Sequence, residues 1–231
     1  MSRVTGLPRI GLLVVLVLGL TLLFFVPPAL SQAYPAMETF LGFSLNNNEY
    51  GTQRNNSPGV HLSLSINPRR SLRVLGDFAV QYHDSSILWW NNRTARVEDF
   101  QLLFGPELAL RRHEKLTPFV HALLGAASRN YAVPTGIWEY DPFTGGYNPK
   151  DYSITRDWGF AAGAGGGLDV NLGGMLALRV AQFDYLPTHL SHEDPVYMPP
   201  QGGFPITQGW QHNYRVAAGI VLKLGERGLP R

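Results

Sequence analysis

A histidine, a serine and a carboxylate lie close together in the last quarter of the chain. His189, Ser191 and Glu193 are the residue types of a serine-hydrolase triad, in which an acid orients a base and the base activates a hydroxyl nucleophile. Geometry defines such a triad more than closeness in sequence does. All three residues are expected in one loop beside Pro187 and Pro195. We therefore interpret them as parts of a polar loop and keep catalysis as an alternative.

Histidines are common metal ligands, but those of this chain do not form a metal-site pattern. The segment 189–194 contains two histidines and two carboxylates, but their spacing matches no established metal site. His61 and His121 each alternate with apolar neighbours, so they are interpreted as members of a buried polar network, because buried polar groups are usually hydrogen-bonded. We expect no metal and no cofactor.

The chain around these residues consists of short segments in which every second residue is apolar. In 60–66, valine, leucine and isoleucine alternate with histidine and serine. A period of two marks β-strands with two different faces. The eight predicted strands lie within 38–45, 60–66, 72–82, 100–111, 117–125, 158–170, 175–185 and 212–224.

Short and long connections alternate between these strands. The long ones are 46–58, 83–95, 128–157 and 186–210, and the others take about four residues. An up-and-down barrel in an outer membrane has short turns on the periplasmic side and long loops outside. The sequence therefore predicts an all-β fold, an eight-stranded antiparallel up-and-down transmembrane β-barrel.

The two faces of the strands fit two solvents. The face predicted to point outward is leucine, valine, isoleucine, phenylalanine and alanine, with aromatic residues near strand ends. An eight-stranded barrel has an interior just wide enough for side chains, so the inward polar groups should pair and leave at most a narrow or gated path. The predicted interior network is Glu38, His61, Arg73, Asp77, Gln101, Glu107, Arg111, His121, Asp169 and Arg215.

Two irregularities break the alternation. Arg179 has the opposite parity from Gln182 and Asp184, which indicates either a bulge near Ala181 or one polar side chain that reaches a boundary. The glycines at 163, 165 and 167 are interpreted as space for large side chains across the interior, or as a strongly coiled strand.

The N-terminus has the features of an export signal. Arg3 and Arg9 precede or flank the apolar run 10–26, and small residues follow a Pro-Pro pair, which predicts a cleaved signal peptide at 1–31. The alternative is an uncleaved membrane anchor, because an apolar run of this length can span a bilayer. The chain has no cysteine, so neither a disulfide nor a lipid-attachment thiol is expected.

Charge argues against a nucleic-acid partner. The chain has 19 basic and 17 acidic residues, and without Arg3 and Arg9 the counts are 17 and 17. No basic patch of the kind that nucleic acid requires is found. We expect one barrel domain at 35–225 and a short tail at 226–231.

The chain resembles the OmpA-like outer-membrane β-barrels, especially the single-domain members. The resemblance covers 35–225 and rests on the strings 38–44, 116–125, 179–185 and 213–222. It implies insertion by the barrel assembly machinery, contact with outer-membrane lipid and a location in the outer membrane of a Gram-negative-type bacterium. Family members often carry an added peptidoglycan-binding domain, but this sequence ends at the barrel, so we expect no such anchoring. The terminal strand ends in Leu224, where the family usually has an aromatic residue.

The predicted function is a non-enzymatic, porin-like outer-membrane barrel with a role in envelope integrity or surface binding. An extracellular ligand could bind loops 128–157 and 186–210, because 128–157 is rich in tyrosine and other aromatic residues. The equal alternative is that these rings pack on one another to order the loop or rest at the lipid boundary. One alternative is a lipid A-modifying hydrolase, because His189-Leu190-Ser191 is similar to the His-x-Ser of the lipid A deacylase barrels. The other is a soluble periplasmic β-barrel that binds a small apolar ligand.

Overall fold

The computed structural model describes residues 34–50, 53–88, 93–134, 138–142, 146–149, 152–191 and 209–227. One compact unit, Pro35–Gly225, contains the barrel. A second unit, Met1–Tyr34 with Glu226–Arg231, lies mostly outside the described residues, and so does the predicted signal peptide.

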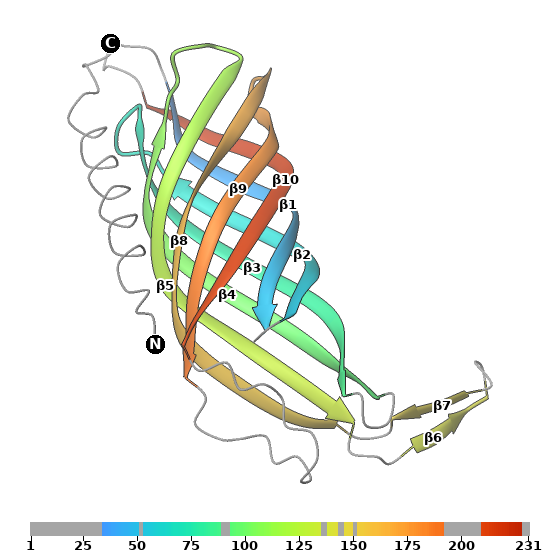
Figure 1. Cartoon of the computed structure of the whole chain (residues 1–231). Helices are drawn as coiled ribbons and strands as arrows, with labels where there is room; N and C mark the ends of the chain where they lie inside the picture. Colours follow the sequence, from blue (N-terminus) through green and yellow to red (C-terminus); the bar gives the residue numbers. More distant parts are fainter. Residues whose placement is uncertain are drawn as a thin grey trace, which may run out of the picture. The chain divides into compact units, whose positions relative to one another are not determined.

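Eight of the described strands form a closed, all-antiparallel barrel in the order β1-β10-β9-β8-β5-β4-β3-β2. The first strand, blue in Figure 1, lies beside the last, red, and this pair closes the sheet. The barrel strands are β1 (Tyr34–Tyr50), β2 (Gln53–Ile66), β3 (Leu72–Leu88), β4 (Arg93–Ala109), β5 (Leu116–Pro134), β8 (Tyr152–Gly173), β9 (Leu176–Ser191) and β10 (Trp210–Arg227). Between β5 and β8, β6 (Trp138–Asp141) and β7 (Gly146–Pro149) form a separate two-stranded sheet. The predicted fold class is confirmed.

The strands are longer than predicted at one end of the barrel. Two of the predicted long loops were wrong, because most of 46–58 and 83–95 is strand: β1 ends at Tyr50 and β2 begins at Gln53, and β3 ends at Leu88 and β4 begins at Arg93. The segments 128–157 and 186–210 also begin and end in strand. In the extension of β1 and β2 both faces carry polar residues, so the period of two disappears although the backbone pairing continues. We call this end the long-strand end.

At the opposite end, which we call the short-turn end, the connections are short and bonded to one another. The backbone N–H of Asn67 donates to the carbonyl of Ala36 (2.9 Å), and that of Asn171 donates to the carbonyl of Lys115 (2.8 Å).

The last strand also differs from the prediction: β10 continues to Arg227, so the predicted tail begins within a strand.

The predicted bulge is present in β9. Its pairing with β8 jumps from Leu168↔Ala181 to Asp169↔Arg179, and its pairing with β10 shifts over the same stretch. Val180 and Ala181 therefore both point outward, while Arg179 points inward. The bulge places one more cation inside the barrel.

The outside of the barrel is apolar and the inside largely polar. Leu41, Phe43 and Leu124 are about 60% exposed on the outer face (57%, 60% and 61%), whereas Arg73 and Arg215 are almost fully buried inside. A water-soluble barrel would place its apolar residues inward. The described residues include no helix long and apolar enough to cross a membrane.

Candidate functional site

A row of paired side chains crosses six strands of the barrel. Arg73 on β3 lies opposite Glu107 on β4, and Glu107 lies opposite His121 on β5. The register continues through a glycine on β8 to Asp184 on β9 and then to Arg215 on β10. Side chains directly opposite one another on a sheet face can touch. We call this set, Arg73, Glu107, His121, Asp184 and Arg215, the interior row.

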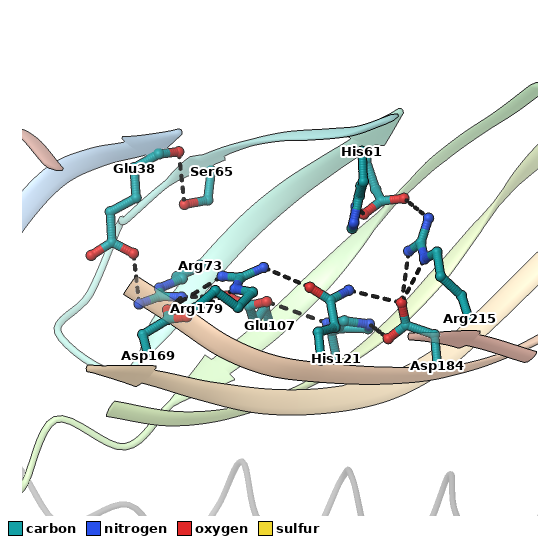
Figure 2. Close-up of polar contacts among 12 residues, drawn as sticks. Glu38, His61, Ser65, Arg73, Glu107, His121, Asp169, Arg179, Asp184 and Arg215 are labelled. Atoms are coloured by element: carbon teal, nitrogen blue, oxygen red, sulfur yellow. Dashed lines mark hydrogen bonds and ion pairs between the residues drawn. The ribbon is translucent and has the colours of Figure 1, made fainter. Parts of the chain in front are cut away.

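Each member of the interior row contacts the next. Arg73 Nη1 lies 2.6 Å from Glu107 Oε1, and Glu107 Oε2 lies 3.3 Å from His121 Nδ1. His121 Nε2 lies 2.9 Å from Asp184 Oδ1, and Arg215 Nε donates to Asp184 Oδ2 (2.8 Å). Figure 2 shows these labelled side chains pointing toward one another inside the barrel. Positive and negative groups alternate along the row.

The row then returns to the strand on which it begins. Arg215 Nη1 donates to Asp77 Oδ1 (2.9 Å), and Asp77 lies on β3, four residues after Arg73. The second oxygen of Asp77 lies 2.5 Å from His61 Nε2 on β2. Charged groups therefore join residues around and across the interior.

One glycine makes the row continuous. Gly165 lies between His121 and Asp184 in the register, and a Cβ at this position would lie 2.1 Å from Asp184 Oδ1. His121 reaches Asp184 because Gly165 has no side chain. Gly163 and Gly167 also leave room for interior side chains. A Cβ at Gly163 would lie 3.1 Å from Leu186 Cδ2, and one at Gly167 would lie 2.6 Å from a ring carbon of Phe119. The structure agrees with the first interpretation of these glycines.

A second group of ion pairs lies toward the short-turn end. Glu38 on β1 joins two arginines: its Oε2 lies 2.6 Å from Arg73 Nη2, and its Oε1 lies 2.9 Å from Arg111 Nη2. Arg73 also lies 3.7 Å from Asp169 on β8. The guanidinium groups of Arg111 and Arg70 donate to each other's backbone carbonyls, which connects the β2–β3 turn to the β4–β5 turn.

Arg179 is held by ion pairing and by two rings. Its Nε donates to Asp169 Oδ1 (2.8 Å) and its Nη1 donates to Gln182 Oε1 (2.7 Å). Its guanidinium carbon lies 4.5 Å from the ring centre of Phe40 and 4.2 Å from that of Phe119. A planar guanidinium stacks on aromatic faces in this way.

The charges of this interior balance. Ionised carboxylates only accept hydrogen bonds, so the two contacts of His121 require both ring nitrogens to carry hydrogen, which is the imidazolium form. His61 needs only one N–H, for Asp77. With His121 charged, five cations face five carboxylates, namely Arg73, Arg111, His121, Arg179 and Arg215 against Glu38, Asp77, Glu107, Asp169 and Asp184. We call these ten residues, with His61, the ionic network.

The interior toward the long-strand end has a different composition. Its buried apolar cluster is Leu75, Leu103, Leu123, Ala127, Ala161, Leu186 and Leu190. Arg129 Nε forms an ion pair with Asp99 Oδ1 there (2.5 Å), and Asn48 Nδ2 also donates to this carboxylate (2.8 Å). The residues here are mostly neutral.

Nine of the ten predicted interior residues belong to the ionic network. The tenth, Gln101, is buried and points inward, but it lies outside the network, and its Oε1 has no hydrogen-bond partner among the described residues. The network also contains two residues that the sequence prediction omitted, Arg179 and Asp184. The parity change near Ala181 was the available signal, because the bulge turns Arg179 to the same face as Asp184.

The predicted loop position was wrong for two of the three triad candidates. His189 and Ser191 lie on β9, and Glu193 lies outside the described residues. His189 is exposed on the outer face, where its ring meets the edge of Trp210 (5.4 Å between ring centres). Ser191 is the last residue of the strand and pairs with Trp158. The described residues contain no group of three histidines or carboxylates arranged to hold a metal ion.

Comparison with known proteins identifies the fold. No protein-family model and no curated protein matches the sequence. The crystal structure of Ail, the attachment invasion locus protein of Yersinia pestis, aligns with 82% of this chain and 100% of its own, with 15% identity and a TM-score of 0.51. The crystal structure of Neisserial surface protein A aligns with 84% of this chain and 99% of its own, with 10% identity and a TM-score of 0.53. The chain therefore has the fold of these eight-stranded barrel proteins.

Proposed function

We propose that this chain is a non-enzymatic, OmpA-like barrel of the bacterial outer membrane, closed to solutes by its ionic network. Its role is to strengthen the envelope and to present the long-strand end at the cell surface. The observation that carries the proposal is the pairing of an exposed apolar outer face with a charge-balanced interior.

The outer face supports a membrane location. Exposed leucine, valine, isoleucine and phenylalanine side chains occur on every barrel strand. A contiguous apolar surface of this kind is rare on a soluble monomer but is typical of a barrel in lipid. A transmembrane strand needs about 9–11 residues. The barrel strands have 14 to 22, so they extend beyond the hydrocarbon.

The interior supports a closed barrel. Arg73 and Arg215 are among the largest fully buried side chains, and both lie between carboxylates from other strands. Opening a path for water or ions would require these pairs to separate, and leaving one buried charge unpaired costs about 3–5 kcal/mol. The same interior does not suit the soluble alternative, because a small apolar ligand would meet charged groups.

The proposed function includes a role at the cell surface. The name of the Yersinia protein describes attachment and invasion, and that of the Neisserial protein describes a surface protein. Insertion by the barrel assembly machinery follows from the outer-membrane location. We place any extracellular ligand at the long-strand end, where 128–157 and 186–210 connect the strands.

Two measurements test this proposal. The full-length protein should fractionate with the outer membrane and show a heat-dependent change in gel mobility, which folded barrels give. The purified protein should produce no steady conductance in planar lipid bilayers. A regular open-channel current would contradict closure, and recovery of the mature chain from the soluble periplasm would contradict the location.

The hydrolase alternative is tested separately. The proposal predicts that lipid A from cells expressing the wild type and from cells expressing Ser191→Ala has the same acylation pattern. A pattern that depends on Ser191 would replace the proposed function with an enzymatic one.

A further inference from the structure

One side of the outer face carries a group of aromatic rings near the long-strand end. Phe160 lies on β8, Tyr185 and His189 on β9, and Trp210, His212 and Tyr214 on β10; we call these six residues the aromatic patch. Neighbouring rings are in contact across the three strands.

The ring contacts form two groups of three, one around Trp210 and one around Tyr185. The ring centre of Trp210 lies 6.0 Å from that of Phe160 and 5.4 Å from that of His189, both edge to face. The ring centre of Tyr185 lies 5.9 Å from that of His212 and 5.6 Å from that of Tyr214. Trp210 is 52% exposed and Phe160 is 47% exposed, so the patch presents ring surface to its surroundings.

A polar rim from the β1–β2 hairpin borders the aromatic patch. Arg54 Nε donates to Asn47 Oδ1 (2.5 Å), and Arg54 Nη2 donates to the carbonyl of His212 (2.7 Å). The backbone N–H of His212 donates to Glu49 Oε2 (2.6 Å), and the Arg54 guanidinium lies 5.1 Å from the ring centre of Tyr214. We call Asn47, Glu49 and Arg54 the polar rim.

The rim is held in place yet remains accessible. Arg54 and Glu49 lie 3.9 Å apart, with side chains 37% and 28% exposed. Their charges offset each other, and the rim offers both donors and acceptors. Such a set suits a neutral, hydroxyl-rich group better than a bare phosphate, which needs donors alone.

Away from the long-strand end, the outer face beside the aromatic patch becomes apolar. Beyond Tyr214, the outward residues of β10 include Val216, Ile220 and Leu222, all about half exposed. On the neighbouring β1, Phe43 and Leu41 continue this apolar surface. One strip of the barrel therefore passes from a polar rim through rings to a hydrocarbon-like surface.

From this order we infer that the aromatic patch and polar rim form a binding site for the sugar headgroup of an outer-leaflet glycolipid. The flat rings would stack on the apolar faces of the sugar rings, the rim would bond the hydroxyl groups, and the acyl chains would lie along the apolar strip. This inference rests on the proposed outer-membrane location.

The test is native mass spectrometry of the full-length, detergent-purified protein, titrated with lipid A bearing its core sugars or with phosphatidylglycerol. The variants are Arg54→Gln and Trp210→Leu. The matched control is Tyr82→Leu, because Tyr82 is also exposed (48%) and lies on β3, four strands from β9 in the eight-stranded ring. Heat-dependent gel mobility shows whether each variant is folded.

Each of the two patch variants should weaken glycolipid binding about tenfold, as loss of one charged hydrogen bond or one buried ring contact would. Binding of phosphatidylglycerol should not change, and Tyr82→Leu should behave like the wild type. Wild-type affinity in folded Arg54→Gln and Trp210→Leu would overturn the inference. Equal losses for both lipids would also overturn it, because they would indicate ordinary interfacial anchoring. Failure of the proposed function would appear independently, in the fractionation experiment.

If Arg54→Gln does not fold, Arg54→Lys tests the same point. Lysine keeps the charge but loses the planar, forked geometry of the guanidinium. Weaker glycolipid binding is expected for this variant as well, and unchanged binding would contradict the role given to the rim.

Discussion

The two halves of the barrel interior are filled by different kinds of side chain. Toward the short-turn end, the ionic network places five cations against five carboxylates from seven strands and the turn between β4 and β5. Toward the long-strand end, a cluster of leucine and alanine packs among mostly neutral buried polar side chains, and Arg129 pairs with Asp99. Ion pairs dominate the first half, which also contains the small apolar cluster Phe40, Ala177, Ala217 and Val221, whereas the second half combines apolar packing with neutral polar side chains.

Both halves contain buried polar atoms without a hydrogen-bond partner among the described residues, including Nδ1 of His61 and Nε of Arg73 in the ionic network. Both side-chain polar atoms of the buried Asn46 lack hydrogen-bond partners among the described residues, and so does Oε1 of Gln81. The carboxylates of the ionic network each contact a cation. A buried charge without a partner costs far more than a buried amide without one, so charged groups require stricter placement. We conclude that the ionic half fixes the barrel geometry.

The largest expected effect comes from removing the arginine that joins two carboxylates. Arg215→Ala leaves Asp77 and Asp184 without their shared cation, and it should lower the free energy of unfolding by about 3–5 kcal/mol. Urea unfolding in lipid vesicles, followed by tryptophan fluorescence, measures the change. Arg112→Ala, in an exposed turn, is the control and should have little effect. A loss below 1 kcal/mol would contradict the structural role of the network.

Cavity formation in the other half should have a comparable or smaller effect. Leu103 is fully buried in the apolar cluster, so Leu103→Ala should cost about 2–5 kcal/mol in the same unfolding assay. Leu102→Ala, at an outward position of the same strand, is the matched control and should cost less. Equal losses for the two would indicate that the apolar cluster is not packed as described.

The glycine in the interior row gives the next effect. Gly165→Ala places a methyl group against Asp184 Oδ1 and the carbonyl of Phe183, and overpacking of this kind costs about 1–3 kcal/mol. Gly76→Ala is the control, because its nearest neighbour would be the edge of the Phe104 ring at 3.2 Å. If both variants unfold at the same urea concentration, Gly165 does not serve to clear the His121–Asp184 contact.

The smallest effect concerns ring stacking on the bulge arginine. Arg179→Lys keeps the charge near Asp169 but loses the flat group between Phe40 and Phe119, so we expect a loss of about 1 kcal/mol. The urea midpoint should therefore fall slightly, with an unchanged slope. A more stable Arg179→Lys variant would show that the stack contributes nothing.

Much of this arrangement could be predicted from the sequence, because one face of each strand is nearly uniform. The alternation around His61 and the opposite parities of Arg73 and Leu72 assign these residues to faces without any structure. The bulge near Ala181 was predicted from a single parity change. The pairing of particular charges could not be predicted, because it depends on the stagger of the strands around the barrel.

The long-strand end was less predictable. The strand around Asn46 and Asn48 has polar residues on both faces, which resembles a loop in sequence although the backbone pairs as far as Tyr50. The apolar half of the interior was also missed. Its signal was present in consecutive apolar residues such as Leu102 and Leu103, which point to opposite faces of one strand.

The central claim is that the outer face contacts hydrocarbon while the inner face contacts neither lipid nor bulk water. Because the chain has no native cysteine, Leu62→Cys and Ser63→Cys each provide one site for a nitroxide label, outward and inward respectively on β2. Electron paramagnetic resonance in lipid vesicles then compares accessibility to oxygen, which concentrates in lipid, and to a water-soluble nickel complex. We predict that the label at position 62 is accessible to oxygen but not to nickel, and that the label at position 63 is shielded from both. A label at position 62 that is accessible to nickel, in protein shown to be folded and inserted, would contradict the account.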